Sequence, residues 1–123
     1  MSSRLIRDIE NSSGDLIEWR QSFCSRYGEV VLGYFNGKNC LINYLVSSSS
    51  KIPWESIKRK ISSYKSSNLK IKVEGGKIVN QISYRYYMLI EIEIKKYKGL
   101  KGGLLELLEK IDKILEIDHN SSL

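Results

Sequence analysis

With 123 residues, the chain is long enough for one domain with a modest hydrophobic core. Its two cysteines are too few for a disulfide scaffold of this size, and no apolar run approaches the length of a membrane span. The net charge of +6 is concentrated in residues 51–77, which carry eight basic and two acidic residues. This charge favours an acidic partner, such as nucleic acid or an acidic protein surface.

Residues 1–14 are expected to be a flexible or short helical lead. A helix is predicted next, because a pair with capping-box spacing, Asp15 and Glu18, precedes apolar residues at helical intervals. Gly28 stands where a left-handed cap would end this helix. The apolar residues of its predicted face are Leu16, Trp19, Phe23 and Tyr27.

A hairpin and a second helix are predicted in the following stretch. The strands are Glu29–Phe35 and Cys40–Val46, and the Asn-Gly sequence between them is the strongest short signal for a hairpin turn. The helix, Ile52–Tyr64, has Pro53 in its first turn, where the missing N–H costs no hydrogen bond. Its apolar stripe consists of Trp54, Ile57, Ile61 and Tyr64.

A second hairpin is predicted from alternating apolar and polar residues. The strand Leu69–Glu74 is expected to end in a turn at Gly75–Gly76, with residues 77–82 pairing back. Because the run that continues to Ile94 is long for one strand, a bulge or bend is expected near residues 83–87.

The outward positions of these strands carry opposite charges. Lys70 and Lys72 alternate with apolar residues on the first strand, as Glu91 and Glu93 do on the last. All four side chains are predicted to point away from the core. If the strands are neighbours, the charges pair across the sheet for roughly a few tenths of a kcal/mol each.

The C-terminal segment changes from a period of two to helical spacing. Leucines and isoleucines recur over Leu104–Leu115 with charged residues between them, which predicts an amphipathic helix that lies across the sheet. The element order α-β-β-α-β-β-α indicates one α+β domain over residues 15–117, followed by a flexible tail over 118–123. We expect an antiparallel sheet with two helices packed on one face, a ferredoxin-like or KH-like ββαββα core behind an N-terminal helix.

The sequence offers little catalytic chemistry. His119, the single histidine, lies in the polar tail without a Cys or carboxylate at metal-ligand spacing. Glu91 and Glu93 are more simply a solvated strand face than an acid–base pair. The glycines within 99–103 precede a helix but lack the spacing of a phosphate-binding loop. We therefore expect no enzymatic activity, no metal ion and no cofactor.

Basic residues interleaved with tyrosines are the main functional signal. Tyr84, Tyr86 and Tyr87 flank Arg85, and lysines with nearby aromatic rings suit an RNA backbone with stacked bases. The alternative is a lysine-rich solvated surface with tyrosines packed in the core. The candidate RNA-binding residues are Lys58, Arg59, Lys60, Lys65, Lys70, Lys72, Lys77 and Arg85.

Protein interaction is a further signal, because an amphipathic helix or a sheet edge can be offered to a partner. The candidate interface lies on the terminal helix and the joint before it. Its residues are Leu100, Leu104, Leu107, Leu108, Ile111 and Leu115.

The second half of the chain resembles a known family. The segments NLKIKVEGGKIV and LIEIEIKKYKGLKGGLLELLEKIDKILEI are similar to the small dimerising subunit of the KEOPS complex, which modifies tRNA. In that family an I-E-I-like strand leads through a Leu-Arg-Gly-like joint into a long leucine-rich helix. Here the corresponding segments are Ile90–Glu93, Leu100–Gly102 and Leu104–Ile114. Lys101 stands where the family has arginine, which indicates a divergent paralogue.

This resemblance implies a non-catalytic role in tRNA modification. Its expected partners are another small subunit or a second copy of itself, the catalytic subunit of the complex, and tRNA. The expected location is the cytoplasm.

The first half of the chain has a rival resemblance. The segments SFCSRYG, VVLGYFNGKNCLINYLV and LKIKVEGGKI, with the basic helix between the last two, are similar to a protein subunit of archaeal RNase P. Gly75–Lys77 stands where that family has Ser-Gly-Thr. This resemblance implies direct RNA binding in a tRNA-processing ribonucleoprotein.

Overall fold

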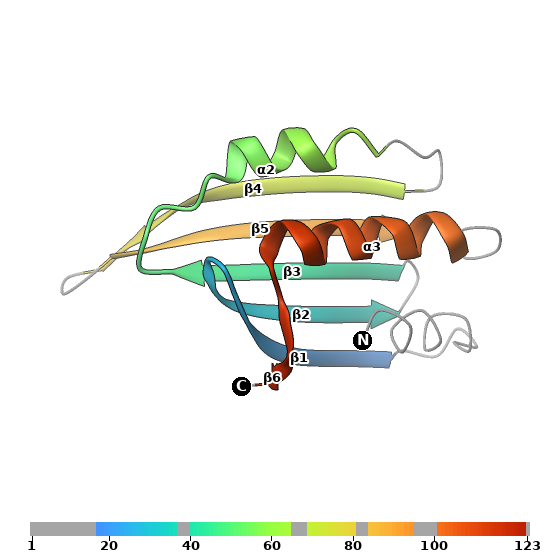
Figure 1. The fold of residues 1–123 in the computed structure, drawn as a ribbon, viewed down its shortest axis with the longest axis horizontal. Coiled ribbons are helices and arrows are strands. Elements are labelled where there is room, and N and C mark those ends of the chain that lie inside the picture. Colours follow the sequence, from blue (N-terminus) through green and yellow to red (C-terminus); the bar gives the residue numbers. More distant parts are fainter. Residues whose placement is uncertain (1–16, 37–39, 65–68, 81–83, 95–100, 123) are drawn as a thin grey trace.

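The computed structural model describes residues 17–36, 40–64, 69–80, 84–94 and 101–122. Six strands and two helices lie in these residues, labelled as in Figure 1. In chain order they are β1 (Ile17–Ser25), β2 (Gly28–Asn36), β3 (Cys40–Ser48), α2 (Trp54–Ile61), β4 (Leu69–Val79), β5 (Tyr84–Ile94), α3 (Lys101–Leu115) and β6 (Asp118–Ser122).

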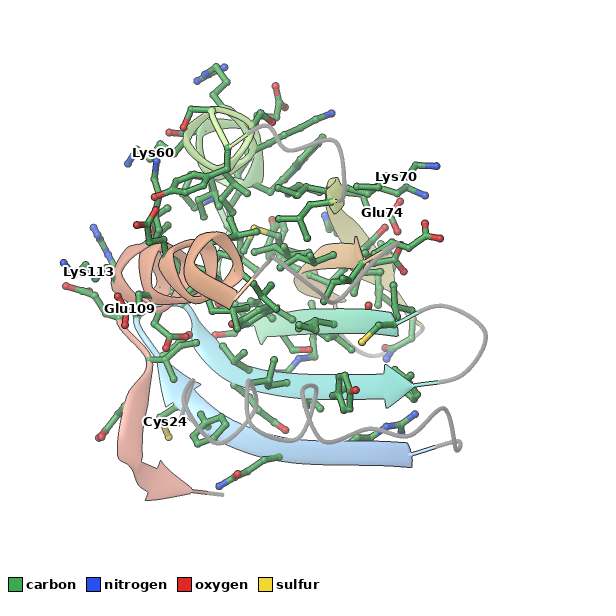
Figure 2. The ribbon with its side chains drawn as sticks, turned by 90° about the vertical axis from the view of Figure 1, so that its right-hand side faces the viewer. Cys24, Lys60, Lys70, Glu74, Glu109 and Lys113 are labelled. Carbon is green, nitrogen blue, oxygen red and sulfur yellow. The ribbon has the colours of Figure 1, made fainter. Side chains whose placement is uncertain are left out.

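The strands form one antiparallel sheet in the order β4-β5-β3-β2-β1-β6. Both helices lie on the same side of this sheet. In Figure 1, α3 crosses in front of β5 and β3, and α2 lies beside β4. Figure 2, turned by 90°, shows the helices on one side of the strands, and no described element covers the other side.

The hydrophobic core lies between the helices and the sheet, and strand alternation decides which residues enter it. In β3, Cys40, Ile42, Tyr44 and Val46 are buried, while the residues between them are more exposed. Full burial of a leucine or isoleucine side chain stabilises a protein by about 1.5–3 kcal/mol. The helices contribute Ile57, Ile61, Leu104, Leu107, Leu108, Ile111 and Leu115 to this core.

The first hairpin and the two later helices agree with the sequence analysis. β2 and β3 pair up to Asn36 opposite Cys40, and the turn residues 37–39 lie outside the described residues. α2 lies within the predicted range Ile52–Tyr64, and α3 covers the predicted Leu104–Leu115 and begins three residues earlier.

The predicted fold class is wrong, beginning with the N-terminal helix. Residues 17–25, most of the segment expected to be helical, form β1, which pairs with β2 from Ile17 opposite Asn36 to Ser25 opposite Gly28. Aromatic and β-branched residues suit a strand, and a few apolar residues three or four apart do not distinguish the two periods. Pairing with β2 decides the matter and buries Phe23. A six-stranded sheet with two helices thus replaces the ferredoxin-like or KH-like ββαββα core behind a helix.

Gly75 and Gly76 do not make the predicted turn. β4 continues through both residues, with Gly75 opposite Met88 and Gly76 opposite Tyr87. A Cβ at Gly75 would overlap the Trp54 ring of α2, so this glycine serves the close approach of helix and strand. A bulge or bend was predicted near residues 83–87. β5 keeps one register with β4 from residue 84 to residue 94, so the described part of that range, 84–87, contains no bulge.

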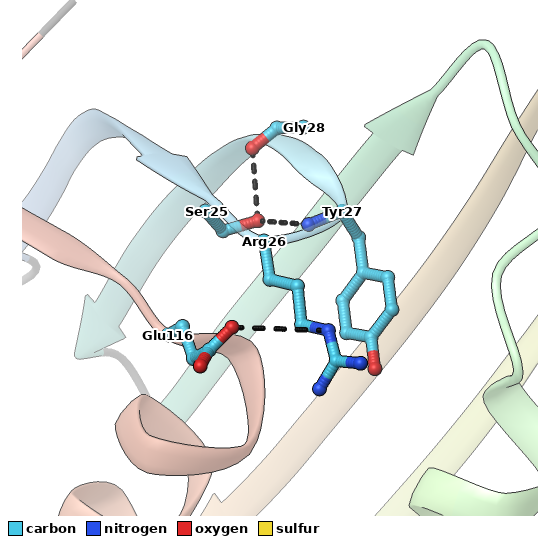
Figure 3. A network of polar contacts seen from close by, with 5 residues as sticks. All are labelled: Ser25, Arg26, Tyr27, Gly28 and Glu116. Atoms are coloured by element: carbon cyan, nitrogen blue, oxygen red, sulfur yellow. Dashed lines mark hydrogen bonds and ion pairs between the residues drawn. The ribbon is translucent and has the colours of Figure 1, made fainter.

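Residues 118–122, expected to belong to a flexible tail, form β6 instead, with Asp118 opposite Cys24 of β1. The chain reaches β6 through Glu116, whose φ of 49° lies in the left-handed region. The β1–β2 turn lies against this end of α3. There the Arg26 N–H donates to the Leu115 carbonyl at 2.9 Å, and Arg26 Nε lies 3.7 Å from Glu116 Oε2 (Figure 3).

The β1–β2 turn itself requires a glycine. The Ser25 hydroxyl donates to the Gly28 carbonyl at 2.8 Å and accepts from the Tyr27 N–H at 3.2 Å (Figure 3). Gly28 has a φ of 125°, and a Cβ there would press on the Ser47 carbonyl of β3. Gly28 was predicted to cap a helix, but it closes a hairpin.

Candidate docking face of the sheet

The sheet surface opposite the helices, called the open face below, consists of residues that alternate with core positions on five strands. The pairing registers arrange them in rows that run across β1, β2, β3, β5 and β4. One row is Ser22, Val31, Leu45, Leu89 and Glu74. The next row is Arg20, Gly33, Asn43, Glu91 and Lys72. A third row continues across β2, β3, β5 and β4 as Phe35, Leu41, Glu93 and Lys70.

A shallow hollow of about 190 Å³ lies in the apolar part of this face. The Arg20 guanidinium carbon lies 5.3 Å from the centre of the Phe35 ring, within cation–π distance. A Cβ at Gly33 would come within 3.3 Å of the Phe35 ring, so the glycine leaves room for that ring. Asn43 Oδ1 is buried without a hydrogen-bond partner among the described residues. The hollow is lined by Arg20, Val31, Gly33, Phe35, Asn43, Leu45 and Leu89.

Charged residues of both signs occupy the β5–β4 side of the open face. Lys70 stands opposite Glu93 and Lys72 opposite Glu91, which confirms that these strands are neighbours. Together with Leu41 they line a second hollow of about 190 Å³. Because each lysine has a glutamate directly opposite, this part of the face is close to neutral and attracts a polyanion weakly.

The predicted RNA-binding residues do not share one surface. Lys58, Arg59 and Lys60 are exposed on α2, on the helix side of the sheet, whereas Lys70 and Lys72 belong to the open face. Figure 2 shows Lys60 and Lys70 on opposite sides of the strands. Contact with RNA by one continuous surface would therefore involve only part of the predicted set.

The other members of that set lie at the far end of the β4–β5 hairpin or outside the described residues. Lys77 Nζ lies 6.0 Å from the centre of the Tyr86 ring, Arg85 is exposed, and Lys65 lies outside the described residues. Tyr86 and Tyr87 are both half-buried, and as neighbours on a strand they point to opposite faces. These two tyrosines therefore do not form one stacking platform. RNA binding by this set stays a prediction.

The candidate interface on the terminal helix needs a correction. Its described residues are at most 2% exposed, because α3 turns its apolar side onto the sheet. They belong to the core of this chain and are not offered to a partner. The residues are Leu104, Leu107, Leu108, Ile111 and Leu115, and Leu100 lies outside the described residues.

Two titratable groups are buried in the core. Burial raises the pKa of the Cys40 thiol, and a hydrogen bond with the Tyr34 side chain partly offsets that increase. Burial raises the pKa of Tyr44 well above its usual range, and the nearby charge of Asp112 raises it further. Both groups therefore stay protonated and enclosed at neutral pH, which suits a structural role.

No metal-binding cluster is present in the described part of the chain. No group of three His, Cys, Asp or Glu side chains there is placed to hold a metal ion. Glu91 and Glu93 both face lysines across the β4–β5 ladder, and the side chain of His119 lies outside the described residues.

A groove of about 370 Å³ lies where the end of α2 meets α3. Lys110 Nζ lies 4.6 Å from the centre of the Tyr64 ring and donates to Ser63 Oγ at 3.2 Å. This contact joins the two helices. The groove is lined by Tyr64, Glu106, Glu109, Lys110 and Lys113, so its charges are mixed.

The sequence analysis did not single out the apolar centre of the open face, although a signal for it exists. β2 reads VVLGYF and β3 reads CLINYLV, with apolar residues on both alternating sets of positions. Continuous apolar runs of this kind are typical of strands that are covered on both faces. The core uses one set of these positions. Val31 and Leu45 belong to the other set, and Leu89 of β5 lies opposite Leu45 on the same face.

Comparison with known protein families, curated proteins and solved structures finds no match for this chain. Neither helix within the described residues is long and apolar enough to cross a membrane. The geometry of the open face is therefore the principal guide to function.

Proposed function

We propose that this protein is a non-catalytic subunit whose open face binds another protein within a larger assembly. The observation that carries this proposal is the apolar row Val31, Leu45 and Leu89, which crosses a face that no described element covers. Leu45 is 40% exposed. An exposed apolar centre with a charged rim is typical of protein interaction sites.

We propose further that the assembly acts on tRNA in the cytoplasm, in line with the resemblance to the KEOPS small subunit. The segments that carry the resemblance lie in β4, β5 and α3 and in the joint between β5 and α3, part of which is outside the described residues. α3 is occupied in the core, so β5 would make the docking contact through the side that bears Leu89, Glu91 and Glu93.

A second candidate function is RNA binding by the outer side of α2, as the rival resemblance to an RNase P subunit implies. Lys58, Arg59 and Lys60 are consecutive and exposed, and exposed Lys51 precedes the helix. The lysines of β4 stand opposite glutamates, whereas α2 has one acidic residue, Glu55. Within the predicted set, α2 therefore suits a phosphate backbone best.

Co-purification with the catalytic subunit of a KEOPS-type complex tests the first candidate. The wild-type chain and a Val79→Asp control should form the complex, and Leu45→Asp should lose it. Val79→Asp makes the same change from an apolar to an acidic side chain as Leu45→Asp does. Val79 is 69% exposed at the end of β4 and lies on the side of the strand opposite to the open face. Equal binding by Leu45→Asp and the wild type would refute docking through the open face.

Titration with tRNA at several salt concentrations tests the second candidate. Reversing the charges of Lys58, Arg59 and Lys60 should weaken binding and lower the slope of log K against log salt by about 1 per residue. Reversing Lys70 and Lys72 is the control and should change the slope less. Unchanged binding by the α2 variant would remove this candidate.

A further inference from the structure

We infer that the far end of the β4–β5 hairpin inserts into the headgroup region of an anionic lipid bilayer. This end, called the hairpin arm below, consists of residues 76–79 of β4 and 84–87 of β5. The inference goes beyond the proposed function and does not depend on it, because the arm lies outside the apolar row of the open face. Three features support it: the projection of the arm, the order of its residues and its charge.

The arm extends past the strand that supports β5. The β3–β5 pairing ends at Ser48 opposite Tyr86. The β4–β5 pairing continues further, to Val79 opposite Tyr84. Figure 1 shows this end of β4 and β5 projecting beyond the end of β3. The outer part of the arm is therefore a two-stranded ribbon.

Large aliphatic side chains are exposed on both faces of this ribbon. Ile78 is 58% exposed and Val79 is 69% exposed. As neighbours on a strand, they point to opposite faces. A partner with a flat surface would cover one of them and leave the other in water. The headgroup region of a bilayer surrounds an inserted ribbon on all sides, so it covers both.

The order of residues along the arm suits a bilayer interface. From the outer end, its described rows contain first Val79, then Ile78 with Arg85, then Lys77 with Tyr86, and last Gly76 with Tyr87. At about 3.3 Å per residue, the rows of Val79 and Tyr87 are about 10 Å apart. Amphipathic segments enter a bilayer interface to a similar depth, about 5–10 Å. The aliphatic residues would thus lie deepest and the tyrosines at the level of the headgroups, which tyrosine favours.

The charge of the arm suits anionic headgroups. Residues 75–90 contain two basic residues, Lys77 and Arg85, and no acidic residue. Both are exposed, and they lie on opposite faces of the ribbon. Their long side chains can reach lipid phosphates while the stems stay beside the aliphatic residues. Each basic residue close to an anionic bilayer surface strengthens binding about fivefold.

Nucleic acid fits the arm less well, although Lys77 and Arg85 belong to the predicted RNA-binding set. A phosphate backbone offers no apolar surface to Ile78 and Val79. Stacking of bases needs aromatic rings that face the same way, and the neighbouring tyrosines of the arm point to opposite faces. The exposed aliphatic residues therefore favour a lipid surface.

Co-sedimentation with lipid vesicles tests the binding. The full-length chain should bind vesicles of phosphatidylcholine with phosphatidylserine, and should bind pure phosphatidylcholine much less. Ile78→Ser combined with Val79→Ser should weaken the binding roughly tenfold or more, because the aliphatic end is lost. Leu45→Ser is the matched control and should bind as the wild type does, since Leu45 is also exposed but lies on the open face.

Two pairs of charge reversals test whether the attraction is local to the arm. Lys77→Glu with Arg85→Glu should weaken the binding about 25-fold or more, because two cations leave the site. Lys58→Glu with Arg59→Glu changes the net charge equally at exposed positions of α2 and should weaken the binding much less. Circular dichroism checks that the variants are folded.

Fluorescence labelling tests whether both faces of the arm enter the bilayer, and it decides alone if a charge or serine variant is unfolded. The background is full-length chain with Cys24→Ser, since Cys24 is only half-buried while Cys40 is buried. An environment-sensitive maleimide dye on Ile78→Cys, and separately on Val79→Cys, should shift its emission to the blue when phosphatidylserine vesicles are added. The same dye on Leu45→Cys should not shift.

Four outcomes would overturn the inference. The wild type would fail to bind phosphatidylserine vesicles, or the two charge-reversed variants would lose equal affinity. A dye shift at only one of Ile78→Cys and Val79→Cys would show that one face alone is covered, as by a protein. A shift with tRNA and none with vesicles would assign the arm to nucleic acid. The proposed function fails separately, because Leu45→Asp that still binds the catalytic subunit would refute docking and leave vesicle binding by the arm unaffected.

Discussion

The two faces of the sheet use the same strands under different constraints. On the helix side, Ile90 and Tyr44 are at most 1% exposed, and the side chains there are enclosed by α2 and α3. On the open side, Leu89 and Leu45 are neighbours of these residues in sequence but are only partly covered. Alternation by single residues therefore separates the positions that stabilise the fold from positions that are available for recognition.

The two faces have different compositions because one is enclosed by helices and the other is not. The buried residues of the helix side are almost all hydrophobic, because a buried polar group without a partner costs free energy. The open side carries charged rows beside apolar ones, an arrangement that would be destabilising in a core. A mixed face of this kind suits a partner of similarly mixed surface better than a uniformly charged nucleic acid.

The largest expected effect is the difference in lost stability between variants of two adjacent residues that lie on opposite faces of the sheet. Ile90→Ala should destabilise the protein by about 2–5 kcal/mol, because it leaves a cavity between sheet and helices. Leu89→Ala should cost about 1 kcal/mol or less in the monomer, because Leu89 is already partly hydrated. Chemical denaturation of both variants measures the difference. Equal losses would show that the open face is covered in the isolated chain.

A second comparison uses the two adjacent glycines of β4. Gly75→Ala should destabilise by about 1–3 kcal/mol, because the added methyl group overlaps the Trp54 ring on the helix side. Gly76→Ala should cost less than about 1 kcal/mol, since its Cβ would lie 3.1 Å from Cε1 of the half-buried Tyr87 ring, which can move toward solvent. Thermal unfolding of the two variants checks this order. A more damaging Gly76→Ala would contradict the assignment of the two faces.

A third prediction concerns pH and the buried Tyr44. Because the folded state raises the pKa of Tyr44, it holds the phenolic proton more tightly than the unfolded chain does. Its contribution is complete below the unfolded value of about 10 and is lost as the pH rises from there toward the folded pKa, by about 1.4 kcal/mol per pH unit. Denaturant midpoints from pH 8 to pH 11 measure the loss, with the pH range chosen about the unfolded pKa. Tyr44→Phe should reduce the decline, and Tyr87→Phe should retain it.

The smallest expected effect belongs to the charges of the open face. A double-mutant cycle on Lys72→Ala and Glu91→Ala should give a coupling of roughly 0.2–1 kcal/mol, as cross-strand pairs do. Lys60 belongs to α2 on the helix side and Glu91 to the open face, so their cycle should be additive and serves as the control. A Lys72–Glu91 coupling within error of zero would show that hydration outweighs the pairing.

The sequence by itself determined those elements whose signals are local. The Asn-Gly sequence predicted the β2–β3 hairpin, Pro53 and the apolar stripe predicted α2, and leucine spacing predicted α3. It also determined that Lys70, Lys72, Glu91 and Glu93 face outward, because a period of two fixes the side of every residue once one is known.

Only the tertiary structure decided the elements whose hydrogen-bond partners are distant in sequence. Residues 17–25 become a strand because β2 and β6 pair with them, and residues 118–122 become β6 because β1 is available beside them. Gly75 looks like a turn residue until Trp54 is placed over it from another element. Which side of the sheet the helices cover is likewise a property of the assembled chain, and that choice leaves Leu45 exposed. The physical reason is that backbone pairing and burial depend on neighbours that a local pattern does not specify.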